Sequence, residues 1–454
     1  MAIESINPAT GVLIRRYQPL TQEELRQKIA IASDSFHNYG SVPLGHRALC
    51  MNKLANLLDE DAVELAKLIT QEVGKPLKAA RAELTKCASV CRYYADNAAR
   101  MLAPELIITD ASRSYVRWDP LGVVLAVMPW NFPFWQVFRF LAPALMAGNV
   151  GLLKHAPNVP QCALAIESLV RRAGFPRGTF QALLIEASQV EEVLGDPRIV
   201  AVTLTGSEAA GRAVGAQAGW LIKKSVLELG GSDPFIVMSS ADIDLAVKNA
   251  ILARCQNSGQ SCIAAKRFIV HESVYADFES KFVAGMAAVQ VGDPMEERTE
   301  IGPLATSRQL ETLDGQVNAA LAAGAKLLTG GRRILGPGFY FEPTVMADLP
   351  RTAFVYRDEI FGPVALLFRA RNLNEAIEIA NDTPFGLAAS AWTRDPAEQQ
   401  RLVAEIQAGA VFLNKMVASD PRLPFGGIKH SGYGRELSAA GMREFLNAKT
   451  VYIA

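Results

Sequence analysis

Residues 122–133 read Gly-Val-Val-Leu-Ala-Val-Met-Pro-Trp-Asn-Phe-Pro, and the fold class follows from how this stretch is built. The run from Gly122 to Met128 is short and apolar, which is typical of a strand buried on both faces of a parallel sheet. The two prolines that follow predict a rigid turn directly after the strand. Because Pro129 and Asn131 interrupt the apolar run, the segment is not a membrane-spanning helix.

The same kind of strand recurs along the chain and alternates with helical patterns. Short apolar runs predict strands at residues 151–154, 199–205, 234–238, 268–271, 364–368 and 410–414. Helical periodicity occupies residues 161–172, 208–219, 243–255, 273–289, 307–323 and 373–380. Alternation on this scale predicts an α/β architecture with parallel sheets.

The first hundred residues are mainly helical. Thr21 and Glu24 have the spacing of a capping box, which predicts a helix from there to Phe36. Longer helical patterns cover residues 47–73 and 77–102, and residues 112–118 alternate like a half-exposed strand. The helical start therefore leads into the alternating region through a strand.

Composition excludes several classes of protein. The chain has 454 residues, with 46 Lys+Arg balancing 46 Asp+Glu. A zero net charge argues against nucleic-acid and membrane-surface partners, because those need clustered positive charge. The six cysteines and an N-terminus without an apolar signal core predict reduced thiols in the cytoplasm. No set of cysteines and histidines has metal-ligand spacing, so we expect no metal site.

Cys262 differs from the other cysteines because it lies among small and polar residues, in the segment Asn257-Ser258-Gly259-Gln260-Ser261-Cys262. At its ordinary pKa only about 3% of a thiol is ionised at pH 7, so a nucleophilic role needs a base or a nearby positive charge. The alternative is a small buried hydrophobe, the usual role of a free cysteine.

Glu228 is a glutamate between two leucines, at the end of a predicted strand and before Gly230 and Gly231. A partly buried carboxyl there would have a raised pKa, which suits a general base. An ion pair or a helix-cap contact explains the position equally well.

Two turns are candidates for binding groups. The prolines around Asn131 could aim its amide at a reacting oxygen, although a plain rigid turn is the simpler interpretation. Gly206 and Ser207 lead from a strand into a helix whose N-terminus could hold a pyrophosphate. A plain strand-to-helix turn with a serine cap is the alternative there.

Taken together and in order, these motifs resemble the aldehyde dehydrogenase superfamily. The resemblance rests on Pro129-Trp130-Asn131-Phe132-Pro133, Thr205-Gly206-Ser207, Glu228-Leu229-Gly230-Gly231 and Gly259-Gln260-Ser261-Cys262, with further matches at residues 6–11, 359–363, 381–387 and 424–432. It covers essentially the whole chain.

The resemblance implies an atypical Rossmann-like cofactor domain, an α/β catalytic domain and a small oligomerisation arm. The corresponding residues would be 1–109 and 127–229 for the cofactor domain, 230–429 for the catalytic domain, and 110–126 and 430–454 for the arm. A strand in the arm would be exposed unless paired, so we expect a homodimer or a dimer of dimers.

The resemblance also implies roles for individual residues. Cys262 would attack the aldehyde, Asn131 would hold the oxyanion, and Glu228 would activate water to release the acid from a thioester. The expected cofactor-binding residues are Trp130, Lys154, Pro157, Gly206, Ser207, Leu229, Glu359 and Phe361.

One departure from the family concerns the cofactor. Many NAD-preferring relatives carry a glutamate three positions after the lysine, whereas this chain has Pro157 three positions after Lys154. Without that carboxylate nothing repels a ribose 2′-phosphate, and Lys154 can attract it. We therefore expect NADP, with NAD also accepted; loose NAD binding is the alternative.

A second departure concerns the substrate. Arg139 stands where relatives that act on neutral aldehydes have an apolar residue and where succinate-semialdehyde dehydrogenases have arginine. A substrate carboxylate would pair with it, and Trp135 and Ser419 are further expected substrate residues. A structural salt bridge is the alternative for Arg139.

The expected activity is therefore NAD(P)-dependent oxidation of an acid semialdehyde, with succinate semialdehyde as the first candidate. A CoA-acylating or broad-specificity aldehyde dehydrogenase is the alternative within the fold. A non-catalytic, structural family member is the alternative from another class; the presence of Cys262, Glu228 and Asn131 together argues against it.

Overall fold

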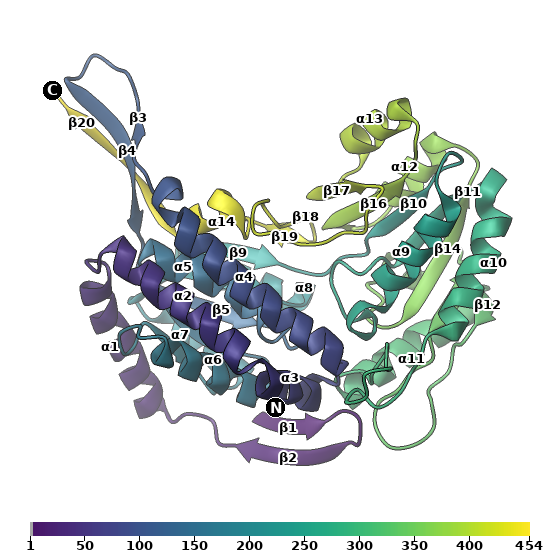
Figure 1. Ribbon diagram of the computed structural model, residues 1–454, viewed down its shortest axis with the longest axis horizontal. Helices are drawn as coiled ribbons and strands as arrows, with labels where there is room; N and C mark the ends of the chain where they lie inside the picture. Colours follow the sequence, from purple (N-terminus) through teal and green to yellow (C-terminus); the bar gives the residue numbers. More distant parts are fainter. Residues whose placement is uncertain (1–2) are drawn as a thin grey trace.

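The computed structural model describes residues 3–454, and two mainly parallel sheets, each with one antiparallel edge strand, dominate it (Figure 1). The first sheet has six strands in the order β19-β9-β8-β5-β6-β7. Their bounds are β5 Val123–Met128, β6 Val150–His155, β7 Phe180–Ala182, β8 Ile199–Thr205, β9 Lys224–Glu228 and β19 Gly432–Tyr433. All neighbours are parallel except β19, which runs antiparallel to β9. The predicted buried strand at 122–128 is confirmed as β5, at the centre of this sheet.

Helices surround the six-stranded sheet, as the sequence predicts. They are α1 Gln22–Tyr39, α2 Leu44–Glu60, α3 Ala62–Val73, α4 Leu77–Met101, α5 Trp135–Ala147, α6 Pro160–Arg172, α7 Val190–Gly195, α8 Glu208–Trp220 and α14 Ser438–Arg443. The capping box of Thr21 and Glu24 is present at the start of α1. The continuous pattern at 47–73 is in fact two helices, because Asp61 leaves the helical geometry between α2 and α3.

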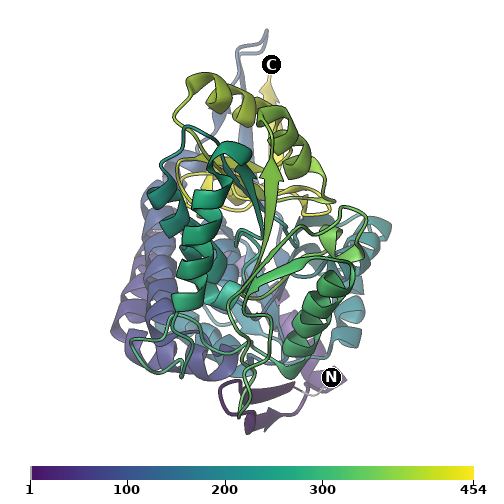
Figure 2. The same ribbon diagram turned by 90° about the vertical axis from the view of Figure 1, so that its right-hand side faces the viewer.

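The second sheet has seven strands in the order β12-β13-β14-β11-β10-β16-β17. Their bounds are β10 Pro234–Val237, β11 Arg267–His271, β12 Lys326–Thr329, β13 Thr344–Ala347, β14 Val364–Ala370, β16 Ala388–Trp392 and β17 Ala410–Leu413. The helices packed on it are α9 Ile243–Cys255, α10 Glu272–Ala288, α11 Ser307–Ala322, α12 Leu373–Asn381 and α13 Pro396–Glu405. Figure 2 shows this unit, in green, in front of the purple and blue helices of the first.

A third sheet, of three strands, projects from the six-stranded unit (Figure 1). It consists of β3 Glu105–Leu106, β4 Arg113–Pro120 and the C-terminal strand β20 Leu446–Ile453, with β4 in the middle. Residues 123–126, which the sequence assigned to the arm, instead belong to β5, and β19 and α14 likewise pack with the six-stranded unit. The projecting sheet is therefore smaller than the predicted arm.

The remaining elements are short. Two-stranded sheets pair β1 Ile3–Asn7 with β2 Val12–Tyr17 and β15 Phe385–Gly386 with β18 Ile428–Lys429. Single 3₁₀ turns are η1 Ala187–Gln189 and η3 Phe354–Arg357, whereas the short turn η2 Gln256–Gly259 contains residues with positive φ angles. Separate apolar cores fill the two units: one lies around the six-stranded sheet, and two cover the faces of the seven-stranded sheet. In the described part of the chain, no helix has the length and apolar character needed to cross a bilayer.

Candidate active site

Cys262 lies on a strained loop between the two units. The loop follows α9, and three consecutive residues, Asn257, Ser258 and Gly259, have φ angles of +52°, +57° and +74°. A Cβ at Gly259 would lie 2.2 Å from the carbonyl oxygen of Gly362, so only glycine fits there. The Ser258 hydroxyl bonds to the backbone of Gly302 on both its donor and its acceptor side. The backbone that holds the sulfur is therefore rigid and conformationally strained, as is common at functional sites.

Two clefts meet at Cys262. The first, of about 830 Å³, is the Trp130 cleft, and its lining includes Trp130, Asn131, Thr205, Gly206, Ser207, Leu229, Glu359 and Phe361. The second, of about 1040 Å³, is the Lys86 cleft, and its lining includes Lys86, Trp135, Arg139, Ser419 and Phe425. Only Gln136 and Cys262, of the described residues, line both. A reacting group at the sulfur can therefore be reached from two directions.

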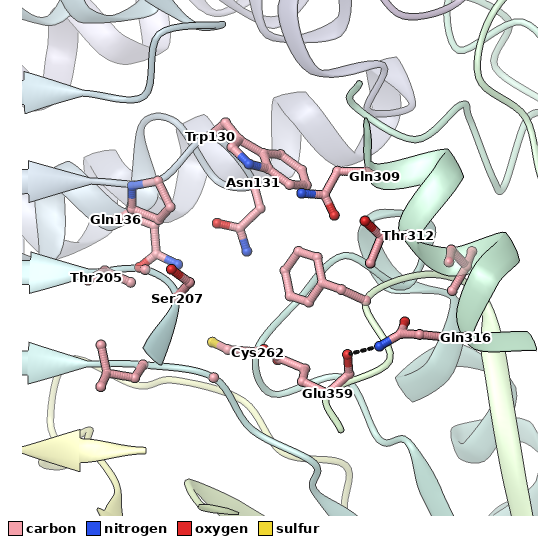
Figure 3. Close-up of a pocket in the computed structure, with 16 residues that line it drawn as sticks. Trp130, Asn131, Gln136, Thr205, Ser207, Cys262, Gln309, Thr312, Gln316 and Glu359 are labelled. Carbon is pink, nitrogen blue, oxygen red and sulfur yellow. Dashed lines mark hydrogen bonds between the residues drawn. The ribbon is translucent and has the colours of Figure 1, made fainter. Parts of the chain in front are cut away.

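The Asn131 side chain points into the Trp130 cleft together with the Cys262 sulfur (Figure 3). Its amide nitrogen donates to the carbonyl of Gln260, 3.1 Å away, and its backbone carbonyl accepts from the Asn257 amide at 2.6 Å. These bonds tie the Asn131 turn to the cysteine loop. One amide N–H remains to donate to an oxygen bound near the sulfur, as an oxyanion hole requires.

His155, at the end of β6, holds the Asn131 turn from the other side. Its Nδ1 accepts from the backbone N–H of Ala156 at 2.9 Å, so Nε2 carries the proton and donates to the carbonyl of Pro133 at 2.9 Å. Burial lowers the pKa of His155 to about 4, so the ring is neutral at physiological pH. The sequence pattern gave no sign of this contact.

The thiol of Cys262 is protonated in the protein as it stands. Burial raises its pKa to about 12, although the positive charges of Arg139 and Lys266 oppose the shift. Lys266 donates to the Cys262 carbonyl at 2.7 Å and forms an ion pair with Glu359 at 3.2 Å, so its charge is mostly balanced. A nucleophilic thiolate at this position needs a base or a bound positive charge.

Glu228 is buried at the end of β9, behind the clefts rather than in them. It lines neither cleft, although its neighbour Leu229 does, and within residues 3–454 neither of its carboxylate oxygens has a hydrogen-bond partner. Burial raises the pKa of this carboxyl well above its ordinary value, and the adjacent Glu436 carboxylate adds to the shift. The carboxyl has the raised pKa that the sequence analysis anticipated, and it must turn toward the sulfur to act there.

The other predicted residues of the Trp130 cleft lie together. β8 ends at Thr205, and the Ser207 hydroxyl caps α8 by accepting from the Ala210 N–H. The Trp130 and Phe361 rings meet edge to face with centroids 5.8 Å apart. Glu359 accepts from the Gln316 amide through its backbone oxygen (Figure 3). These residues supply helix N–H groups, flat rings and a carboxylate in one cleft.

Lys154 and Pro157 are not among the residues that line either cleft. Lys154 is the fifth residue of β6, its side chain is 8% exposed, and no carboxylate of the described chain pairs with it. Burial lowers the pKa of its ammonium. An unpaired ammonium at the end of a parallel strand is suited to an anionic ligand group.

Arg139 and Lys86 supply positive charge to the Lys86 cleft in different ways. Arg139 Nε lies 2.7 Å from a carboxylate oxygen of Glu436, which is the salt bridge that the sequence left open as the alternative. Its guanidinium also lies over the Phe425 ring. Lys86 donates to the Ser419 hydroxyl at 2.6 Å and was not predicted from the sequence.

The sequence model of the aldehyde dehydrogenase family matches residues 1–451. The chain belongs to the aldehyde dehydrogenase family. Among its relatives, "Succinate-semialdehyde dehydrogenase [NADP(+)] 1" of Mycobacterium tuberculosis and "Succinate-semialdehyde dehydrogenase [NADP(+)]" of Mycobacterium leprae are each 55% identical to it over 457 residues, covering 100% of both chains.

Solved structures agree with this aldehyde dehydrogenase fold. A succinic semialdehyde dehydrogenase from Streptococcus pyogenes, in complex with NADP+, has a TM-score of 0.97 at 37% identity, covering 99% of each chain. A structure described for cofactor and substrate selection by Gox0499 has a TM-score of 0.99 at 40% identity, covering 100% of each chain. The predicted family and fold class are confirmed.

Sequence reasoning about this aldehyde dehydrogenase missed Lys86 for a clear reason. Lys86 lies inside the long helix α4, where a lysine normally marks the solvated face, and its partners Trp135 and Ser419 are distant in the chain. No local signal marks it, because half-buried Lys86 adjoins buried Cys87 just as exposed Lys78 of the same helix adjoins buried Leu77.

Proposed function

We propose that this aldehyde dehydrogenase oxidises succinate semialdehyde to succinate with NADP as the electron acceptor. The observation that carries the proposal is the position of Cys262 at the meeting point of two clefts of different chemistry. One cleft offers helix N–H groups and aromatic rings, and the other offers positive charge. The names of the relatives that are 55% identical, which are NADP-dependent succinate-semialdehyde dehydrogenases, support the same activity.

The residues of the Trp130 cleft fit a dinucleotide. Gly206 leaves open space on its cleft side, because a Cβ there would meet only the Leu204 side chain, at 3.6 Å. Ser207 and the first turn of α8 would hold the pyrophosphate, and Phe361 with Glu359 would hold the nicotinamide ring and its ribose. When bound, the nicotinamide supplies the acceptor for the aldehyde hydride.

Lys154 would select the phosphorylated form of the dinucleotide. Its ammonium has no carboxylate partner within residues 3–454, and the position three residues later is Pro157 rather than an acid. A 2′-phosphate would therefore meet an attractive charge and no repulsive one. NAD, which lacks the phosphate, would bind but lose this contribution.

The chain's own residues supply the acyl chemistry. The Cys262 thiol gives its proton to the ionised Glu228 carboxylate, which then releases it to solvent, and the sulfur adds to the aldehyde carbon. The oxyanion of the resulting thiohemiacetal accepts from the Asn131 amide and the Cys262 N–H. Oxidation of this adduct leaves a thioester on the sulfur. Glu228 then takes a proton from water, the hydroxide adds to the thioester carbonyl, and the acid leaves as the thiol is restored.

Initial rates of reduced-dinucleotide formation test the proposal. We expect succinate semialdehyde with NADP to have the highest kcat/KM among succinate semialdehyde, glutarate semialdehyde and butanal with each dinucleotide. Butanal has the same carbon count without the carboxylate, so it is the matched control. A kcat/KM for butanal equal to that for succinate semialdehyde, or turnover that requires added CoA, would overturn the proposal. The Cys262→Ala variant is the inactive control.

We also propose roles for the larger parts of the molecule. The unit around the six-stranded sheet would bind the cofactor and the seven-stranded unit would carry Cys262. The projecting sheet would pair with a second copy, because its two outer strands are free edges and its Ile108 side chain is 100% exposed. Light scattering of the purified protein distinguishes a dimer or dimer of dimers from a monomer. The free thiols of all six cysteines fit a reducing, cytoplasmic setting.

A further inference from the structure

Lys86 reaches the Lys86 cleft from α4, close to the reacting sulfur. Its ammonium nitrogen lies 4.3 Å from the centre of the Trp135 ring and donates to the Ser419 hydroxyl at 2.6 Å. The same cleft is lined by Cys262. The ammonium is therefore held in a defined position by a ring and a hydroxyl, neither of which neutralises its charge.

Three cationic side chains line this cleft, and two of them already have carboxylate partners. Lys75 is paired with Glu83, and both are completely buried. Arg139 is paired with Glu436 and is 2% exposed. By contrast, no carboxylate within residues 3–454 lies at ion-pair distance from the Lys86 ammonium, whose hydrogen-bond partner is a neutral serine. Lys86 is therefore the cationic side chain of this cleft whose charge is not balanced by a carboxylate and is available to pair with an anionic ligand.

The electrostatics of the cleft add to this difference. The pKa of Lys86 is lowered to about 8, first by burial and then by the positive charge of Arg139 on the facing helix, while Cys87, Glu83 and Asp420 act in the opposite direction. A half-buried ammonium without a counter-charge is costly. A ligand carboxylate placed next to it would relieve that cost and keep the lysine protonated.

We propose that Lys86 binds the carboxylate of the substrate and is the residue that selects acid semialdehydes over neutral aldehydes. This inference rests on the proposed function and names the charge that gives it specificity. Ser419 shares the carboxylate through its hydroxyl, and the Trp135 ring forms the wall along which the carbon chain lies. Arg139 supports the site indirectly, by balancing Glu436.

The test compares Lys86→Met and Lys86→Arg with the wild type on succinate semialdehyde and on butanal. Lys86→Met keeps the length of the side chain but removes the charge, so we expect kcat/KM for the acid to fall by about ten- to a hundredfold, the range for a lost charge-assisted hydrogen bond. The effect on butanal should be far smaller. Lys86→Arg keeps the charge and should retain most of the preference. Lys78→Met, an exposed lysine of the same helix, is the matched control.

Two further readouts separate binding of the anion from damage to the fold. Succinate, the product, should inhibit butanal oxidation by the wild type and much less by Lys86→Met. The KM of the wild type for succinate semialdehyde should rise as the pH passes 8, because the free ammonium loses its proton, and Lys86→Arg should lack this rise. Thermal unfolding checks that each variant is folded.

The outcomes distinguish this inference from the function on which it rests. If the wild type itself does not prefer succinate semialdehyde to butanal, the proposed function fails and this inference fails with it. If the wild type has the preference and folded Lys86→Met keeps it, the function stands and Lys86 is not the selecting residue. A loss of equal size for both aldehydes in Lys86→Met also overturns the inference, since it indicates a structural role.

Discussion

Arg139 Nε lies 2.7 Å from Glu436 Oε2, and both side chains are buried beside the Glu228 carboxyl. The positive charge of Arg139 lowers the pKa of both carboxyls, against the larger effect of burial. One buried guanidinium therefore helps to ionise two acids behind the reacting sulfur. The first prediction tests this relationship.

Replacing Arg139 with methionine should lower the activity on every aldehyde to the same extent. Without the guanidinium, the pKa values of Glu228 and Glu436 rise further, so the pH at which kcat increases moves upward. Losing one partner of a buried ion pair should also cost about 3–5 kcal/mol of stability, part of which Arg139→Met combined with Glu436→Gln should recover. The measurements are the pH profile of kcat and thermal unfolding. A rise in KM for the acid substrate alone, with an unmoved profile, would show that Arg139 binds the carboxylate itself.

Replacing Glu228 with glutamine should separate activity from stability. The loss of the base should lower kcat by about 10²–10⁴-fold. A carboxyl whose pKa is raised on folding keeps a proton that the unfolded chain releases, so wild-type stability falls as the pH rises above the unfolded value. Glutamine does not titrate, and the variant should be more stable than the wild type at pH 8 but not at pH 4. Chemical denaturation at both pH values measures this.

The control for that experiment is Glu311→Gln, which changes an exposed carboxyl on α11. It should change neither kcat nor the pH dependence of unfolding. A Glu228→Gln protein that is less stable than the wild type at pH 8 would mean that the carboxylate is stabilised in the fold, contrary to its lack of partners.

Iodoacetamide should modify one thiol of the native protein. Cys262 is partly buried, whereas the other five cysteines are buried. Because burial raises the pKa of Cys262 to about 12, the reaction should be slow at pH 7 and should accelerate about tenfold per pH unit up to pH 9. Mass spectrometry identifies the site, and Cys262→Ala should remain unmodified. A fast reaction at pH 7 would contradict the protonated thiol.

Replacing His155 with phenylalanine should loosen the Asn131 turn. The carbonyl of Pro133 loses its donor, which should cost about 1–3 kcal/mol of stability, and kcat should fall because the Asn131 amide is no longer held. His46→Ala, at an exposed position, is the control. Since the wild-type ring is neutral, activity should show no transition from His155 between pH 5 and 8. If the variant is destabilised but its kcat is unchanged, His155 contributes to the stability of the fold and not to catalysis.

Replacing Lys154 with methionine should reduce the preference between dinucleotides. We expect KM for NADP to rise about tenfold, as for a lost charge-assisted contact, and KM for NAD to change less. Steady-state kinetics with both cofactors provides the measurement, and Lys53→Met, an exposed lysine on α2, is the control. If the KM values for NADP and NAD change equally, a residue other than Lys154 binds the 2′-phosphate.

Local patterns were enough to predict most of the framework. Apolar runs marked β5, β6 and β8 correctly because a strand buried on both faces must be apolar throughout. The break between α2 and α3 was missed, since Asp61 lies in a sequence whose periodicity continues across it. Short edge strands such as β19 depend on a distant partner and leave no periodic signal.

The site was predictable only where one residue carries the chemistry by itself. Cys262 and Asn131 stood out by their local surroundings, and they do line one cleft. Long-range pairing could not be predicted, because the partner that balances Arg139 belongs to the C-terminal segment and the unbalanced charge of Lys86 is visible only when its neighbours are known. Charge compensation is a property of the folded chain.

Because only two of the described residues line both clefts, selectivity for the aldehyde and selectivity for the dinucleotide can be altered independently. A protein engineer could rebuild the wall formed by Lys86, Trp135 and Ser419 for a longer, bulkier or uncharged aldehyde without touching the dinucleotide contacts. The same separation would let natural variation retune substrate choice by a few substitutions while coenzyme choice is inherited unchanged.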